Sequence, residues 1–155
     1  MRISRLMAVA AIGCAISGAA AIPALAGPNH SAHPAGTHGT LDSSISPHTA
    51  HNGTRITMHA SGAHKKTDYI CLFALVKGSQ HGQNLNNSTS VTSSKKGKFS
   101  CSLTFHPFHA TVAGKVRHCP LTKADKKAHI VCGFAAADPS DPNGSNAFWP
   151  IKAKK

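Results

Sequence analysis

The chain has 155 residues, with 17 Lys or Arg against 5 Asp and no Glu, which gives a formal net charge of +12. This length corresponds to one small domain at most, which excludes a multidomain enzyme. The acids are scattered, and the chain has no nucleophile elbow and no H-E-x-x-H motif, so we expect a protein that is not an enzyme.

Residues 1–26 are predicted to be a Sec-type signal peptide. Arg2 and Arg5 precede an uncharged run of apolar and small residues, and Ala24-Leu25-Ala26 is a small-x-small cleavage site. The run is shorter than the ~20 apolar residues that a membrane span needs, so we expect no transmembrane segment after cleavage. The mature chain would begin at Gly27 with a net charge of +10, and would be secreted, either extracellular or associated with the cell wall.

The mature chain divides into a tail, one domain and a short basic end. Residues 27–40, GPNHSAHPAGTHGT, contain mostly Gly, Pro, His and Thr. We expect them to form a disordered tail, because such residues cannot pack a core. Residues 41–152 carry the alternating patterns of a folded domain, and residues 153–155 are a basic tail.

Short strands are predicted in the first half of the domain. In Arg55–Ala60, Ile56 and Met58 alternate with polar residues and are expected to face inward. Tyr69–Val76 reads YICLFALV and is apolar on both faces, which predicts a central strand. The other elements expected in this half are a strand at Leu41–Ser46, a loop at Gly78–Asn87 and a short edge strand at Ser88–Thr92.

The clearest alternation lies in the stretch KFSCSLTFHPF, which ends at Phe108. Its inward residues are expected to be Phe99, Cys101, Leu103 and Phe105. The elements expected after it are a strand or irregular crossing at Thr111–Val116, a charged loop with room for one helical turn at Cys119–Ala128, a buried strand at Ile130–Ala136 and a last strand at Ala147–Ile151.

About seven short strands without a useful amphipathic helix predict an all-β sandwich. Its core is expected to contain Phe73, Phe105 and Phe134.

Four cysteines follow the predicted signal peptide, and an even number in a small exported chain indicates two disulfides. Three pairings of Cys71, Cys101, Cys119 and Cys132 exist. A bond between the inward residues Cys71 and Cys101 would join the two sheets, and Cys119 with Cys132 would close a short loop. A metal site is the alternative reading, but the chain has no C-x-x-C pair.

Four segments, in order along the chain, resemble the neocarzinostatin family. Ile45-Ser46-Pro47 is similar to its opening V-S-P, and Asn52–Gly62 is similar to its second strand, D-G-x-T-V-T-V-x-G-x-G. Gly97–Phe105 resembles its G-x-x-x-x-S-L-T-V strand, and Ile130–Asp138 resembles its C-x-V-G-x-x-D segment. The resemblance covers nearly all of residues 44–152. It implies a seven-stranded immunoglobulin-like antiparallel β-sandwich in a small secreted actinobacterial protein.

The departures from the family bear on the disulfides. The family's first disulfide closes a hairpin after the central strand, but His81 and Gln83 stand at the downstream positions here. Cys101 occupies a position where the family usually has a small or polar residue. The resemblance therefore implies the pairs Cys71–Cys101 and Cys119–Cys132. A further departure is charge, because the known carriers in the family are acidic and this chain is basic.

The resemblance implies a monomeric, non-catalytic binding protein with an antibacterial or defensive role. Some members carry enediyne chromophores, so an enediyne-type chromophore is the cofactor implied here, as a small hydrophobic ligand with DNA as its eventual target. Apolar and aromatic side chains line the family's cleft at the open end of the sandwich. The residues expected to do so here are Phe108, Phe148 and Trp149, because they fall near strand ends.

The lysine clusters support an alternative function. They would attract phosphate and other anionic polymers in a salt-sensitive manner that does not depend on sequence. On this alternative, the protein is a cell-envelope interaction protein without a small ligand. The candidate polyanion-binding residues are Lys65, Lys66, Lys95, Lys96, Lys98, Lys126 and Lys127.

The 12 histidines raise a third alternative, extracellular metal binding. They form three H-x-x-H pairs: His30/His33, His48/His51 and His106/His109. Residues three apart point to opposite faces of a strand, and each pair lies beside a proline or in coil. No specific metal site is predicted from these pairs.

Overall fold

The computed structural model describes residues 38–141 and 146–155. The predicted signal peptide and most of the predicted tail therefore lie outside the described residues. Within the described residues, no helix is long and apolar enough to cross a membrane.

Most of the described residues lie in β-strands. These are β1 His38–Gly39, β2 Asp42–Ser46, β3 Thr49–Ala50, β4 Arg55–Ser61, β5 Asp68–Lys77, β6 Gln80–Thr92, β7 Phe99–Thr104, β8 Phe108–Val112, β9 Lys115–Cys119, β10 Val131–Ala137, β11 Asn146–Pro150 and β12 Lys152–Ala153, with helix α1 at Lys123–Lys127.

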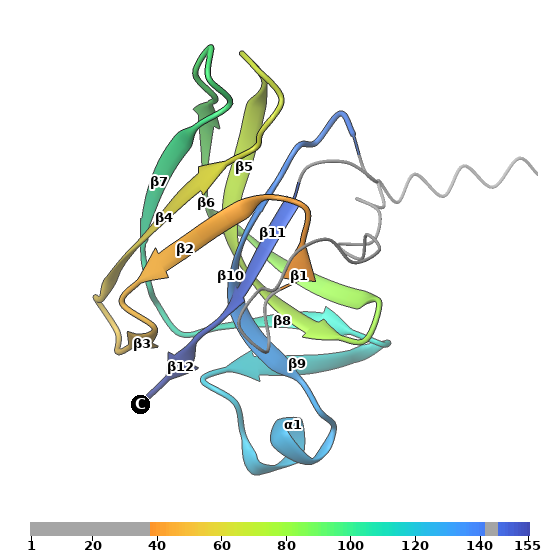
Figure 1. Cartoon of the computed structure of the whole chain (residues 1–155). Helices are drawn as coiled ribbons and strands as arrows, with labels where there is room; N and C mark the ends of the chain where they lie inside the picture. The colour runs from red at the N-terminus through yellow and green to blue at the C-terminus, as the bar shows by residue number, and fades with distance from the viewer. Residues whose placement is uncertain (1–37, 142–145) are drawn as a thin grey trace, which may run out of the picture.

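Two antiparallel sheets form a sandwich (Figure 1). One has the strand order β1-β11-β10-β5-β6, and the other has the order β2-β4-β7. The hairpin β8–β9 and the short parallel pair β3–β12 complete the fold. Apart from the two-residue strand β1, the two main sheets contain seven strands. The predicted all-β, seven-stranded sandwich is confirmed.

The core between the sheets is built around Phe73 of β5. Its ring centroid lies 5.0 Å from that of Phe134 and 5.4 Å from that of Phe105, and all three residues are fully buried. Ile56 and Met58 of β4 are also fully buried, as their alternation predicted. Edge-to-face and tilted aromatic contacts of this kind stabilise a core beyond the area that they bury.

Both predicted disulfides are present. Cys71–Cys101 joins β5 to β7 and therefore links the two sheets across the core. Cys119–Cys132 joins β9 to β10 and ties the β8–β9 hairpin to the larger sheet.

Two predictions of local structure were wrong. The predicted loop at Gly78–Asn87 is mostly the first part of β6, which pairs with β5 from Lys77↔Gln80 to Phe73↔Asn84. Its polar residues have low strand propensity, but the ladder with β5 outweighs this preference. Thr111–Val116 is not a single strand, because the chain turns at Ala113 and Gly114 to form the β8–β9 hairpin. The charged segment Cys119–Ala128, in which the sequence left room for one helical turn, contains the short helix α1.

We expect the bond between the sheets to be a large part of the stability. Replacing Cys71 and Cys101 together with Ala should lower the free energy of unfolding by about 3–4 kcal/mol, because the bond closes a loop with a sequence separation of 30 residues. Denaturant unfolding of the oxidised proteins measures this change. The matched Cys119→Ala/Cys132→Ala variant should lose about 3 kcal/mol. A loss of less than 1 kcal/mol for the first variant would contradict this role.

Candidate functional site

The larger sheet has a second apolar face, on the side away from the sandwich core. Side chains alternate along β5, so Cys71, Phe73 and Leu75 point inward while Leu72 and Ala74 point outward. A separate cluster of buried residues lies there, which we call the outer cluster: Leu72, Ala74, Ala135 and Phe148. Ile70 and Val76 pack against its edge.

The register of the sheet brings the outer cluster together. Leu72 pairs with Ala135, and Ala135 pairs with Phe148, so three adjacent strands contribute to one row. Ala74 pairs with Gly133 in the next row. A Cβ atom at Gly133 would lie 2.3 Å from Cζ of Phe148, which means that the phenyl ring occupies the space above this glycine. Gly133 therefore permits Phe148 to cover the outer face of β10.

A small apolar cavity adjoins the outer cluster. Its volume is about 30 Å³, roughly the volume that one molecule occupies in liquid water. The residues that line it are Ile70, Leu72, Gln83, Leu85, Ala135, Ala137 and Pro139. Leu85 is 62% exposed although it is a large apolar residue, so it forms a partly open wall.

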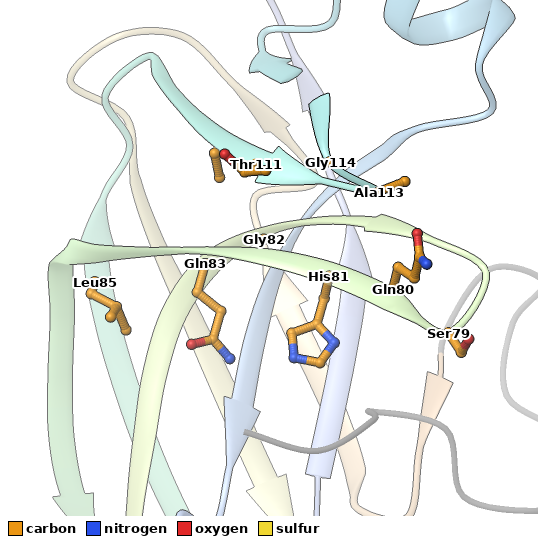
Figure 2. Close-up of a pocket in the computed structure, with 10 residues that line it drawn as sticks. Ser79, Gln80, His81, Gly82, Gln83, Leu85, Thr111, Ala113 and Gly114 are labelled. Atoms are coloured by element: carbon orange, nitrogen blue, oxygen red, sulfur yellow. The ribbon is translucent and has the colours of Figure 1, made fainter. Parts of the chain in front are cut away.

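A wider groove runs along β6 beside the tip of the β8–β9 hairpin, and we call it the β6 groove. Its volume is about 660 Å³, and it shares Gln83 and Leu85 with the apolar cavity. Figure 2 shows His81, Gln83 and Leu85 projecting from the same side of β6, away from Thr111. On the other side, a Cβ atom at Gly82 would lie 2.6 Å from the Thr111 carbonyl oxygen, so β6 packs directly on β8.

Asp138 holds the chain where it leaves β10 at the rim of the apolar cavity. Its Oδ1 accepts hydrogen bonds from the backbone N–H of Ser140 at 2.8 Å and from the Ser140 hydroxyl at 2.6 Å. Its Oδ2 lies 3.6 Å from Nδ1 of His64. Burial alone would raise the pKa of Asp138, but the hydrogen bonds from Ser140 and Asp141 and the charge of His64 lower it below the ordinary value. The carboxylate thereby fixes the turn that contains Pro139.

The structure does not bring together the three residues predicted to line a ligand pocket. Phe148 lies in the outer cluster, whereas Trp149, the next residue of β11, belongs to the inner core and donates its indole N–H to Oγ of Ser43 at 2.9 Å. Phe108 packs against the inner core, with its ring centroid 6.4 Å from that of Phe73. Of these three residues, only Phe148 lies on the outer face.

The predicted polyanion residues fall at two ends of the molecule. The turn with Lys65 and Lys66 lies next to the turn with Lys95–Lys98, because the N–H of Ala63 donates to the Gly97 carbonyl oxygen at 3.0 Å. We call these two turns the lysine end. Figure 1 shows them side by side, with α1 and its Lys126 and Lys127 at the opposite end of the molecule.

The histidine pairs of the sequence do not form metal sites in the described residues. No group of three or more His, Cys, Asp or Glu side chains there is arranged to hold a metal ion. His30 and His33 lie outside the described residues. Nδ1 of His106 is 2.8 Å from Oδ1 of Asn52, while the ring of His109 faces His118 instead.

Sequence reasoning identified the strand that carries the outer cluster but not the cluster itself. The signal was present, since YICLFALV is apolar on both faces and one face must lie outside the sandwich core. The same alternation along β10 could have predicted that Ala135 and Ala137 also lie on this outer face. The contributions of Gln83 and Leu85 were missed because that segment was predicted to be a loop.

No family model and no curated protein sequence matches the chain. Among solved structures, the fold is similar to that of macromomycin, with a TM-score of 0.59 and 23% sequence identity. The match covers 74% of this chain and 100% of the macromomycin chain. Macromomycin belongs to the neocarzinostatin family, so the resemblance seen in the sequence is confirmed at the level of the fold.

The lowered pKa of Asp138 predicts a pH-dependent contribution to stability. An acid whose pKa is depressed by folding stabilises the protein above its unfolded pKa of about 3.8, and the contribution is lost as the pH falls through the folded value. Asp138→Asn should therefore lower the free energy of unfolding by about 1.5–3 kcal/mol at pH 5–8.

The difference between Asp138→Asn and the unmodified protein should shrink as the pH falls below about 4. Urea unfolding of both proteins across this range measures it, with Asp42→Asn as the control because the side chain of Asp42 is exposed. A difference that stays constant down to pH 2 would show that the charge of Asp138 is not responsible.

Proposed function

We propose that the protein is a secreted, non-catalytic carrier that binds a small hydrophobic ligand on the outer face of its larger sheet. The outer cluster carries this proposal. A soluble sandwich normally exposes polar side chains on the outer faces of its sheets. Here two adjacent strands place Leu72, Ala74 and Ala135 on that face, beside a cavity with an apolar lining.

The volumes of the apolar cavity and the β6 groove limit the size and shape of the ligand. A drug-sized ligand needs about 300–1,000 Å³, whereas the apolar cavity has a volume of about 30 Å³. Leu85 and Gln83 separate this cavity from the β6 groove of about 660 Å³. Both are long side chains, and rotation of the exposed Leu85 would join the two spaces. A flat apolar body would then lie against Leu72 and Ala135, with polar substituents in the β6 groove.

The sequence resemblance narrows the ligand to an enediyne-type chromophore. Such a chromophore is a small hydrophobic ligand, so its apolar part would lie on the outer cluster and any polar groups in the β6 groove. The net charge of +10 expected for the mature chain would attract the loaded carrier to DNA, which is the target that the resemblance implies. An antibacterial or defensive role follows from that combination.

A neutral aromatic probe tests the proposed binding face without contributions from the lysines. We expect 1-aminoanthracene to bind with increased fluorescence, and Leu85→Gln to weaken binding about five- to tenfold because the variant loses roughly half of a leucine's apolar contact. Val116→Gln is the matched control, since Val116 is 57% exposed and lies outside both hollows. Fluorescence titration of the purified protein gives both dissociation constants.

Equal affinities for Leu85→Gln and the unmodified protein would place the ligand elsewhere. The chromophore itself is tested on protein isolated from its natural source. Visible absorbance, with an extractable organic compound identified by mass spectrometry, would support it. A colourless protein without such a compound would contradict the proposal that the ligand is a chromophore. The location of the binding face would still be tested by the probe titration.

The lysine end supports a second candidate function, the binding of anionic polymers. Hydrogen bonding between its two turns holds Lys65 and Lys66 close to Lys95, Lys96 and Lys98. Such a concentration of lysines on neighbouring turns gives a local positive potential that a phosphate or teichoic acid backbone can follow. Lys126 and Lys127 form a smaller basic group on α1.

Two matched variants separate local attraction from net charge. Lys65→Ala/Lys66→Ala and Lys126→Ala/Lys127→Ala each remove two positive charges, from opposite ends of the molecule. We expect the first to reduce the slope of log affinity for duplex DNA against log salt concentration by up to about two, and the second to change it by less than one. Fluorescence anisotropy over a salt series measures both slopes. Equal effects would mean that only net charge matters.

A further inference from the structure

The β8–β9 hairpin places two histidines opposite each other. Ala113 and Gly114 both have positive φ, at 54° and 70°, as a two-residue type I′ turn requires. In such a hairpin the pair that flanks the turn, Val112↔Lys115, is hydrogen-bonded, and hydrogen-bonded and non-hydrogen-bonded pairs then alternate. His109↔His118 is the third pair beyond it and is therefore non-hydrogen-bonded, the type in which opposing side chains lie closest.

The two imidazole rings are close enough to share an ion. Their centroids are 6.5 Å apart, with an angle of 48° between the ring planes. Metal–nitrogen distances of 2.0–2.1 Å would place the centroids of two histidine ligands about 5–6 Å apart. Both residues are exposed, so a small rotation of each ring brings them to this separation without moving the backbone.

A buried carboxylate lies behind His118. Oδ2 of Asp125 is 3.5 Å from Nδ1 of His118, and it also accepts hydrogen bonds from the Thr122 hydroxyl at 2.7 Å and the backbone N–H of His118 at 3.3 Å. These bonds fix the carboxylate, which is almost fully buried. The contact is longer than a hydrogen bond, but a carboxylate charge beside Nδ1 favours the tautomer in which Nδ1 carries the proton and Nε2 has a free lone pair. Carboxylates behind metal-binding histidines act in this way.

We propose that His109 and His118 bind a divalent transition metal ion through their outer ring nitrogens, with Asp125 as the positioning residue for His118. Two imidazoles favour Cu²⁺ over Zn²⁺ in the usual order of affinities. Lys115 and Arg117 on the same strand oppose a cation, and the guanidinium of Arg117 is drawn toward Asp125, with Nη1 3.4 Å from Oδ1. Water completes the coordination, so the ion stays accessible from solvent.

This site differs from the H-x-x-H pair that the sequence contains. In that pair His106 would be the partner of His109, but the ring of His106 lies beside Asn52. The cross-strand pair is visible only from the hairpin register. The proposal is also independent of the ligand-binding face, because neither His109 nor His118 lines the apolar cavity or the β6 groove.

Site-resolved NMR on the full mature chain tests the proposal, because other histidines are present. Imidazole ¹⁵N spectra followed during addition of Zn²⁺ should show Nε2 of His109 and His118 changing first, with His118 protonated at Nδ1. His118→Gln should weaken this first binding event at least tenfold. His106→Gln is the matched control and should leave it unchanged, since it removes the partner that the H-x-x-H motif would need.

Three results would overturn the proposal. In the first, one equivalent of Zn²⁺ perturbs only histidines outside the hairpin. The second is an equal loss of affinity in His106→Gln and His118→Gln. The third is a His118 tautomer with the proton on Nε2, which would remove the role of Asp125. The substituted side chains are exposed, and amide spectra of the variants confirm the fold before any titration.

Discussion

The Cys71–Cys101 bond fixes which face of β5 belongs to the core. Because it joins β5 to β7 across the sandwich, Cys71 must point inward, and alternation then sends Leu72 and Ala74 outward. A shift of one residue would exchange the two sets and break the bond. The disulfide thus stabilises the sandwich and also determines the composition of the outer face. The aromatic cluster around Phe73 enforces the same orientation from inside the core.

Different parts of the molecule carry different candidate interactions. The outer cluster and the apolar cavity lie on the larger sheet, the lysine end lies at the turns beyond β4 and β6, and the His109–His118 pair lies on the hairpin that Cys119–Cys132 ties to β10. Each depends on the sandwich for its geometry, but none shares its main residues with another. The proposed binding of an apolar ligand and the proposed binding of a polymer would therefore use separate parts of one scaffold.

Most of the sandwich could be predicted from the sequence because its strands carry strong period-two signals. The alternation of Phe99, Cys101 and Leu103 gave both the strand and its inward face. The start of β6 could not be predicted, because its Gln and Asn residues are held in a strand by pairing with β5 and not by their own propensity. The predicted pocket placed Phe148 and Trp149 together, although neighbours on a strand face opposite sides.

On the proposed function, an apolar ligand binds to the outer face of the larger sheet and not within the sandwich core. Methyl NMR on selectively labelled protein tests it directly during addition of a neutral aromatic ligand. We expect shift changes and intermolecular contacts at the methyl groups of Ile70 and Leu72, while Ile56 and Leu103 stay unchanged. Contacts with Ile56 or Leu103, without any at Leu72, would place the ligand inside the sandwich and contradict binding at the outer face.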